Sequence, residues 1–202
     1  MDAARERLLR AAREVFDEEG FRGATTRRIA ARAGVNEVTL FRHFASKEEL
    51  IGAALEWGHG EAMARLGAAA LPVIPRDLDG DLRPFLRSVL RAFAASNRGV
   101  RTAMAEWEHL PSFRGWLLGP SEAVAAELGR YLVAAQAAGL MRGEVDALAV
   151  THVLLATLFW HGLMPSMLPE RFAGGAEVSM ERCIDVVIDA IRRPPEGEEV
   201  GS

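Results

Sequence analysis

Basic side chains gather in one short segment of the chain, where they could bind a polyanion. Between residues 22 and 47 there are six basic residues and a single acidic one, Glu37, which gives a local charge of +5. Residues 51–202 hold 14 basic and 19 acidic residues, a balance of −5. A solvated helix face would mix both signs, so this segregation favours contact with a nucleic acid. The basic residues are Arg22, Arg27, Arg28, Arg32, Arg42 and Lys47.

The elements that position these residues have the pattern of a helix-turn-helix. Gly20 can end a first amphipathic helix, and Thr25 or Thr26 can cap the second. Gly34 allows a tight turn, and Asn36 can cap the third. The predicted helices cover residues 3–19, 26–32 and 37–44, and the capping box SKEE at 46–49 opens a fourth. Two short helices joined by AGVN behind a longer one predict a helix-turn-helix.

The third helix has an inner and an outer face. Leu40 and Phe44 are four residues apart, so they share the face that we expect to pack on the first two helices. The opposite arc can then enter a major groove of double-stranded DNA. That arc consists of Val38, Thr39, Phe41 and Arg42, with His43 toward its rim.

Composition predicts an all-α protein with a sizeable core. Half of the 202 residues are hydrophobic, and alanine, leucine, arginine and glutamate outnumber valine, isoleucine and threonine. The longest apolar stretch, 147–164, is interrupted by Thr151, His152 and His161, so we expect a core or interface helix there and no membrane partner. The first 16 residues carry no apolar signal core, which leads us to expect a soluble cytoplasmic protein.

The rest of the chain reads as further helices punctuated by proline and glycine. The fourth helix is expected to extend to about residue 70, and residues 71–81 to form a loop. Pro84, Pro111 and Pro120 are expected to mark helix boundaries. The further predicted helices cover 82–96, 98–109, 120–138, 146–164 and 179–192.

The first 50 residues resemble the TetR family of bacterial transcriptional regulators. The shared elements are a glycine and an aromatic residue after the first helix, threonines before Ile-Ala, then Ala-Gly-Val, Thr-Leu-aromatic, His-Phe and Ser-Lys-Glu. The resemblance implies a ligand-responsive repressor that binds a palindromic operator as a homodimer and is released by a small, mostly apolar effector. It implies a helix-turn-helix DNA-binding domain at 1–47 and a helical effector-binding and dimerisation domain at 48–193. The proline-rich and acidic segment at 194–202 is itself expected to be a disordered tail.

By position, the resemblance also implies which residues meet DNA. Thr26 and Lys47 would hold phosphates at the N-termini of the second and fourth helices. Phe41 stands where the family usually has tyrosine, so it can offer packing but no hydroxyl to a phosphate. The residues expected in or beside the groove are Arg27, Asn36, Glu37, Val38, Thr39, Phe41, Arg42 and His43.

Two further sets of residues are predicted in the C-terminal region. The last two helices would form the dimer interface, although an intramolecular core is the alternative for any one residue. The predicted interface residues are Thr151, Leu154, Leu155, Leu158, Ile184, Val187, Ile188 and Ile191. Large adaptable side chains could line an effector pocket, although structural core is again the alternative. That set is Trp57, Phe93, Met104, Trp107, Leu110, Phe113, Trp116, Phe159, Trp160 and Met164.

The sequence gives little support to catalysis or to a bound metal or cofactor. Glu106 and His109 could place two ligands on one helix face, but no third has convincing spacing. His152 and His161 lie on opposite sides of their helix, and the single cysteine, Cys183, excludes a cysteine-based zinc site. No nucleotide-binding loop or nucleophile motif is present. The alternatives kept open are a helical DNA-binding protein without an effector, and an activator.

Overall fold

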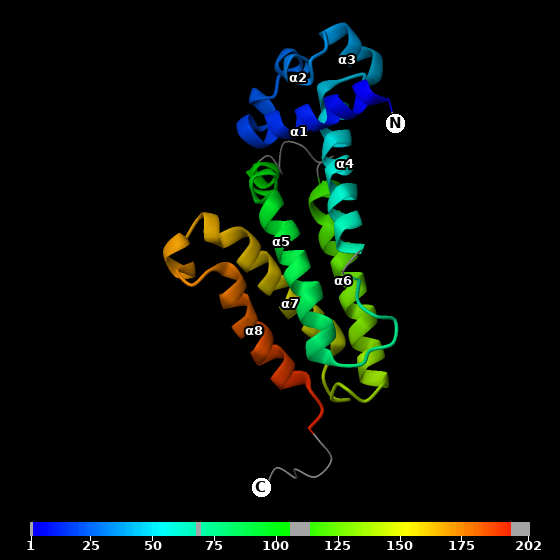
Figure 1. Cartoon of the computed structure of the whole chain (residues 1–202), viewed down its shortest axis with the longest axis vertical. Coiled ribbons are helices and arrows are strands. Elements are labelled where there is room, and N and C mark those ends of the chain that lie inside the picture. Colours follow the sequence, from blue (N-terminus) through cyan, green and yellow to red (C-terminus); the bar gives the residue numbers. More distant parts are fainter. Residues whose placement is uncertain (1, 68–69, 106–113, 195–202) are drawn as a thin grey trace. The chain divides into compact units, whose positions relative to one another are not determined.

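The computed structural model describes residues 2–67, 70–105 and 114–194, which form eight α-helices (Figure 1). Within these residues, extended backbone pairs only at a single bridge between Met141 and Arg192. The prediction of an all-α fold is therefore confirmed. The helices are α1 Ala3–Gly23, α2 Thr26–Ala33, α3 Glu37–His43, α4 Lys47–Gly67, α5 Leu78–Ala105, α6 Arg114–Ala137, α7 Ala147–Leu163 and α8 Ala176–Ile191.

The chain folds as two compact units, and α5 and α6 each contribute to both. The first unit comprises residues 1–65 and 95–121, and the second comprises residues 66–94 and 122–202. These units are defined by how the residues pack and not by what they bind. The predicted boundary at residue 47, between a DNA-binding and an effector-binding domain, therefore stays a prediction.

The core of the first unit is formed largely by apolar side chains of the three N-terminal helices. Leu8, Leu9, Ala12 and Phe16 on α1 are buried together with Ile29 on α2 and Leu40 on α3. Ala103 from the end of α5 belongs to the same core. Gly20 breaks the regular helix within α1, as expected, because its φ of 71° is a conformation that favours glycine. Helical turns then resume as far as Gly23.

Two predicted helix boundaries are wrong. Helix α5 runs unbroken from Leu78 through Pro84 to Ala105, where the sequence had suggested two helices. Pro120 likewise lies inside α6 instead of starting it. Burial of Leu82, Leu86 and Val89 along one face of α5 offsets the single hydrogen bond that a proline removes.

The start of α5 lies within the stretch predicted as a loop. The carboxylate of Asp77 accepts hydrogen bonds from the backbone N–H groups of Asp79 and Gly80, the latter at 2.8 Å, so it caps the helix. The Asp81 carboxylate accepts from the backbone N–H of Arg76 and from the hydroxyl of Tyr131, the latter at 2.9 Å. Tyr131 is fully buried on α6, so this bond ties α6 to the start of α5.

Helices α5 and α8 are joined by a ladder of ion pairs in the second unit. Arg83 Nη1 lies 2.6 Å from Glu181 Oε2, and Arg83 Nη2 lies 2.6 Å from Asp185 Oδ1. Burial by itself raises the pKa of the Glu181 carboxyl, but hydrogen bonds from Arg87 and Arg83 outweigh it and lower that pKa. Both helices contribute residues four apart, and their order fixes an antiparallel register. The pairs are Arg83 with Glu181 and Asp185, Arg87 with Glu181, and Arg91 with Glu177.

Helix α7 is a partly buried core helix. The segment Ala147–Ser166 is long and apolar enough to cross a membrane by composition, with a mean hydropathy of 1.6, yet 44% of it is buried in the fold. It packs against α8. The buried imidazole of His161 connects the two helices, since Nδ1 lies 2.7 Å from the Thr157 carbonyl oxygen and Nε2 lies 3.1 Å from the Ser179 hydroxyl.

The approach of α7 to α5 depends on a glycine. A Cβ at Gly162 would lie 2.9 Å from a ring carbon of Phe93 and 3.1 Å from its Cβ, which is closer than packed atoms allow. We expect Gly162→Ala to lower the free energy of unfolding by about 1–3 kcal/mol through this overpacking. Urea denaturation monitored by circular dichroism measures the change.

Gly129→Ala on α6 is the matched control, because its nearest neighbour, the Thr151 hydroxyl, would be 3.8 Å from the new methyl group. That variant should gain up to about 1 kcal/mol from helix propensity. Equal stability of the two variants would contradict the assigned packing of α7 on α5.

Candidate nucleic-acid interface

The turn between α2 and α3 is fixed by backbone hydrogen bonds and by one glycine. Gly34 has a φ of 68°, and its N–H donates to the carbonyl oxygen of Ala31. The N–H of Val35 donates to the carbonyl of Ala30 at 3.0 Å, which completes the end of α2. The Asn36 side chain then caps α3 by accepting from the Thr39 N–H at 2.8 Å. The two short helices therefore meet in one defined orientation.

Helix α3 has the two faces that the sequence indicates. Leu40 and Phe44 are buried in the core of the first unit. Val38 is 79% exposed and Phe41 is 53% exposed, and Arg42 is also exposed. Large apolar side chains at such exposure beside an arginine form a surface suited to a partner. His43 is half-buried instead, with Nε2 3.4 Å from the Asp2 carboxylate, so it lies at the edge of this face.

The basic segment is partly neutralised by acidic residues of α1, which the sequence analysis did not anticipate. Arg28 forms an ion pair with Glu19, and Arg32 forms ion pairs with Glu14 and Glu18. The hydrogen bond with Arg32 lowers the pKa of the Glu18 carboxyl. The four-residue spacing of Glu14 and Glu18 placed both on one face of α1, but the sequence could not tell which helix they meet.

Three arginines of the basic segment keep their charge unpaired. Arg22, Arg27 and Arg42 are exposed, and in the described part of the chain they form no ion pair. Arg27 lies in the first turn of α2 and Arg42 in the last turn of α3. Arg22 was counted in the basic segment but was not predicted to contact DNA. These residues carry the positive charge that remains available to a partner.

Lys47, the first residue of α4, is held by the end of α1. Its Nζ donates to the carbonyl oxygen of Phe21 at 2.9 Å and lies 3.9 Å from the centre of the Phe21 ring. Ser46 caps α4 by accepting from the Glu49 N–H, and the Glu49 carboxylate accepts from the Ala45 N–H at 2.7 Å. The predicted capping box is present, with Ala45 as the backbone donor in place of Ser46.

Thr26 and Glu37, two residues predicted at the DNA face, are bonded to each other. The Thr26 hydroxyl donates to Glu37 Oε1 at 2.7 Å, and both residues are partly buried. The bond joins the first residue of α2 to the first residue of α3. The sequence had placed both side chains near DNA without indicating that they meet.

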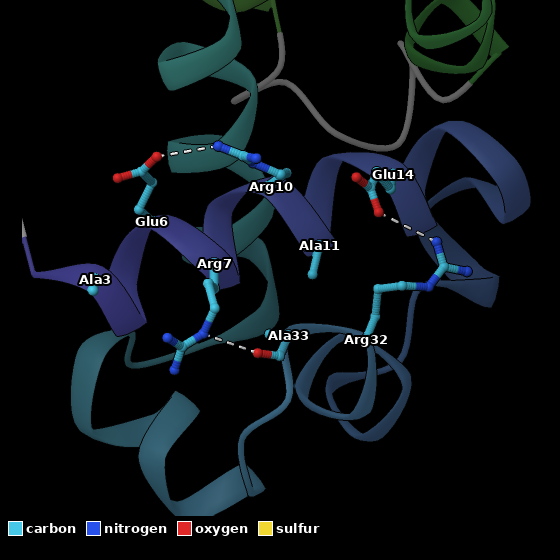
Figure 2. Close-up of a pocket in the computed structure, with 8 residues that line it drawn as sticks. All are labelled: Ala3, Glu6, Arg7, Arg10, Ala11, Glu14, Arg32 and Ala33. Carbon is cyan, nitrogen blue, oxygen red and sulfur yellow. Dashed lines mark hydrogen bonds and ion pairs between the residues drawn. The ribbon is translucent and has the colours of Figure 1, made fainter.

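A groove of about 360 Å³ lies between α1 and α2, and its charged groups are paired within the chain (Figure 2). Arg10 forms an ion pair with Glu6, and Arg7 Nε donates to the Ala33 carbonyl oxygen at 3.2 Å. Figure 2 shows Arg32 reaching across from α2 to Glu14. The bonds of Arg7 and Arg32 join α1 to α2, whereas the Arg10–Glu6 pair lies within α1.

The predicted dimer residues mostly face inward. Six of them are buried within the protomer, whereas Leu155 and Val187 are partly exposed. The buried six are packed within the protomer, which is the alternative of an intramolecular core that the sequence left open, because α7 is apolar on all sides and periodicity does not identify its outer face. The buried residues are Thr151, Leu154, Leu158, Ile184, Ile188 and Ile191.

The predicted effector residues are divided between the two units. Trp57 and Met104 lie in the first unit, and Trp116 lies on the part of α6 that belongs to it. In the second unit the Phe93 ring packs edge-on against Phe159, with centroids 5.9 Å apart. Phe159 and Trp160 are exposed on α7, and Met164 is partly buried. The remaining predicted residues, Trp107, Leu110 and Phe113, lie outside the described residues.

No metal-binding cluster of three or more histidine, cysteine, aspartate or glutamate side chains is found where the structure describes the chain. The pair Glu106 and His109 lies in the undescribed stretch 106–113.

Comparison with known proteins assigns the N-terminal region to a family. Residues 8–54 match the family model of bacterial regulatory proteins, tetR family. An HTH-type transcriptional repressor of Mycobacterium tuberculosis is 38% identical over 89 residues, which are 43% of this chain and 46% of that protein. The class C tetracycline repressor protein of Escherichia coli is 38% identical over 101 residues, 48% of this chain and 42% of the repressor. The matches thus span less than half the length of these relatives.

Solved structures extend the likeness in fold to nearly the whole chain. A transcriptional regulator from Rhodococcus sp. Rha1 aligns with a TM-score of 0.74 at 23% identity, covering 95% of this chain and 99% of that one. GusR of Salmonella enterica aligns with a TM-score of 0.68 at 26% identity, covering 92% and 95%. Residues 8–54, which include the helix-turn-helix, are thus similar to the tetR family of bacterial regulatory proteins, and the all-α fold of the chain resembles that of these solved regulators.

Proposed function

We propose that the protein is a cytoplasmic, ligand-responsive repressor that binds a palindromic operator as a homodimer and leaves it when a small, mostly apolar effector binds. The observation that carries the proposal is the exposed face of α3, where Val38 and Phe41 stand beside the unpaired Arg42. Both curated relatives described above bear the name repressor, which favours repression over activation.

Each DNA-facing residue has a role that its geometry permits. The guanidinium groups of Arg27 and Arg42 form no ion pair with any described residue, so they can bind guanine edges or phosphates. Lys47 uses one of its three ammonium donors on Phe21, so two stay available to a phosphate. The backbone N–H groups in the first turn of α2, at Thr26 and Arg27, suit a second phosphate. Thr39 and Phe41 would meet sugar, phosphate or a thymine methyl, and Asn36 would act mainly through its cap.

Dimerisation supplies the charge that one protomer lacks. Each phosphate contact contributes modestly and weakens with salt, so the few basic side chains that one protomer offers cannot give tight binding. A two-fold pair doubles the contacts and matches two half-sites about one DNA turn apart. Apart from Phe159 and Trp160, which belong to the predicted effector set, the exposed apolar residues of α7 and α8 are suited to the interface; they are Leu148, Val153, Val178 and Val186.

Arg42→Ala should weaken operator binding by roughly tenfold or more and relax the base preference at one position. The operator is located by footprinting the protein on the DNA that flanks its gene, and affinity is measured by fluorescence anisotropy over a range of salt concentrations. Arg171→Ala, which removes the same charge from an exposed site in the second unit, is the control and should bind within about twofold of wild type. Equal losses in both variants would refute α3 as the reading helix.

Val186→Glu should convert the dimer to a monomer and reduce operator affinity, because a carboxylate would be buried at the interface without a partner. Val186 is 70% exposed in the protomer, so the change should leave the fold intact. Analytical ultracentrifugation measures the assembly. Val73→Glu changes an apolar residue before α5 that is 80% exposed, and this control should remain dimeric. A wild-type protein that sediments as a monomer would rule out the proposed homodimer.

A small apolar compound should raise the melting temperature by about 5 °C or more at a hundredfold excess over its Kd, and should release operator DNA. The support for such an effector is the set of tryptophan, phenylalanine and methionine side chains, together with the name of the tetracycline repressor relative. A thermal-shift screen of apolar acids, steroids and aromatic compounds tests it. The Arg42→Ala variant should show the same effector-induced rise in melting temperature, although its affinity for operator DNA is reduced. If no compound stabilises the protein or releases DNA, the alternative without an effector is favoured.

A further inference from the structure

The hydrogen bond between Thr26 and Glu37 is not needed to cap α2 or α3, because each helix has another N-cap. Thr25 already caps α2 by accepting from the Arg28 N–H at 3.3 Å. Asn36 already caps α3 by accepting from the Thr39 N–H. The 2.7 Å bond from the Thr26 hydroxyl to Glu37 Oε1 is therefore additional to both caps. Its direct effect is to hold a flexible carboxylate side chain in one position, which lowers the entropy that Glu37 would lose on meeting a ligand.

The held carboxylate lies at the edge of the exposed face of α3. Glu37 precedes Val38, which is 79% exposed, and stands one helical turn before Phe41. Oε1 is occupied by the Thr26 hydroxyl, whereas Oε2 forms no hydrogen bond with any described residue. An ionised carboxylate can only accept hydrogen bonds. Oε2 is thus an acceptor on a carboxylate that the Thr26 hydroxyl holds beside the face proposed to enter the major groove.

Base chemistry determines which partner such an acceptor selects. In the major groove cytosine presents the N4 amino donor without an acceptor of its own. Guanine presents N7 and O6, and thymine presents O4, all of which would repel a carboxylate. Adenine offers its N6 amino group, but the neighbouring N7 is an acceptor. Cytosine is therefore the base that suits Glu37 best.

We propose that Glu37 selects cytosine at one position of each operator half-site, and that Thr26 is the positioning residue that holds its carboxylate. The proposal rests on the function proposed above, because it requires α3 to enter the major groove. It gives Thr26 a task separate from phosphate binding, which its backbone N–H can still perform.

Selection of duplexes from a randomised library tests the proposal, with wild type, Glu37→Gln, Thr26→Val and Thr26→Ser compared side by side. Wild type should enrich cytosine at one position of each half-site by about tenfold over other bases. Glu37→Gln replaces an acceptor with an amide that can also donate, so the preference there should move from cytosine to adenine. Thr26→Val keeps the shape but removes the hydroxyl, and should reduce the cytosine preference to about threefold or less. Thr26→Ser restores the donor and should restore the preference.

The outcomes separate this proposal from the one on which it rests. If wild type enriches an operator and Glu37→Gln enriches the same bases, Glu37 does not read DNA and the proposal is overturned. If Thr26→Val lowers affinity equally for all sequences and leaves the cytosine preference intact, the hydroxyl is merely structural and the positioning role is overturned. If wild type enriches no duplex, the proposed function itself fails. Melting temperatures of the four proteins show that each variant is folded; should Thr26→Val unfold, Glu37→Gln alone decides whether Glu37 reads the base.

Discussion

Burial of Leu40 and Phe44 in the core beneath α1 and α2 determines how α3 is presented. A helix of seven residues is too short to be stable alone, so its orientation comes from the packing of this one face. Once those two side chains are buried, the exposed positions follow from helical geometry, and Val38, Phe41 and Arg42 must lie outside. The αL glycine at Gly34 and the cap at Asn36 fix where the helix begins. The rest of the candidate interface depends on this arrangement.

The net positive charge of the candidate interface is smaller than its number of basic side chains suggests, because acidic residues neutralise some of them. Glu14, Glu18 and Glu19 hold Arg28 and Arg32 against α1, where exposed ion pairs stabilise the helix packing only modestly. Within the described residues, the positive charges of the basic segment that no carboxylate neutralises are those of Arg22, Arg27, Arg42 and Lys47. A protein of net charge −4 can then bind a polyanion without a basic surface everywhere.

The second unit uses polar groups mainly to set register. The arginine–carboxylate ladder aligns α5 with α8, the Tyr131 hydroxyl ties α6 to the start of α5, and His161 connects α7 to α8. These groups make directional bonds, so they select one arrangement among many that would bury a similar apolar area. The exposed residues of α7 and α8 include large apolar side chains, such as Val153 and Val186, beside charged ones such as Arg182 and Asp189. Exposed apolar side chains of that kind favour association.

Local patterns in the sequence were sufficient for the helix-turn-helix, because Gly20, Gly34 and Asn36 act on their own backbone and Leu40 and Phe44 mark one helix face. They were insufficient where the outcome depends on a distant segment. Pro84 and Pro120 lie inside long helices because burial elsewhere offsets their cost, and Thr151, Leu154 and Leu158 turn inward because α7 is apolar all round. The pairing of Thr26 with Glu37, and of Arg32 with Glu14, was likewise decided by tertiary structure. A hydrogen bond or ion pair between two helices depends on their relative position. The spacing of residues along one helix carries no information about that position.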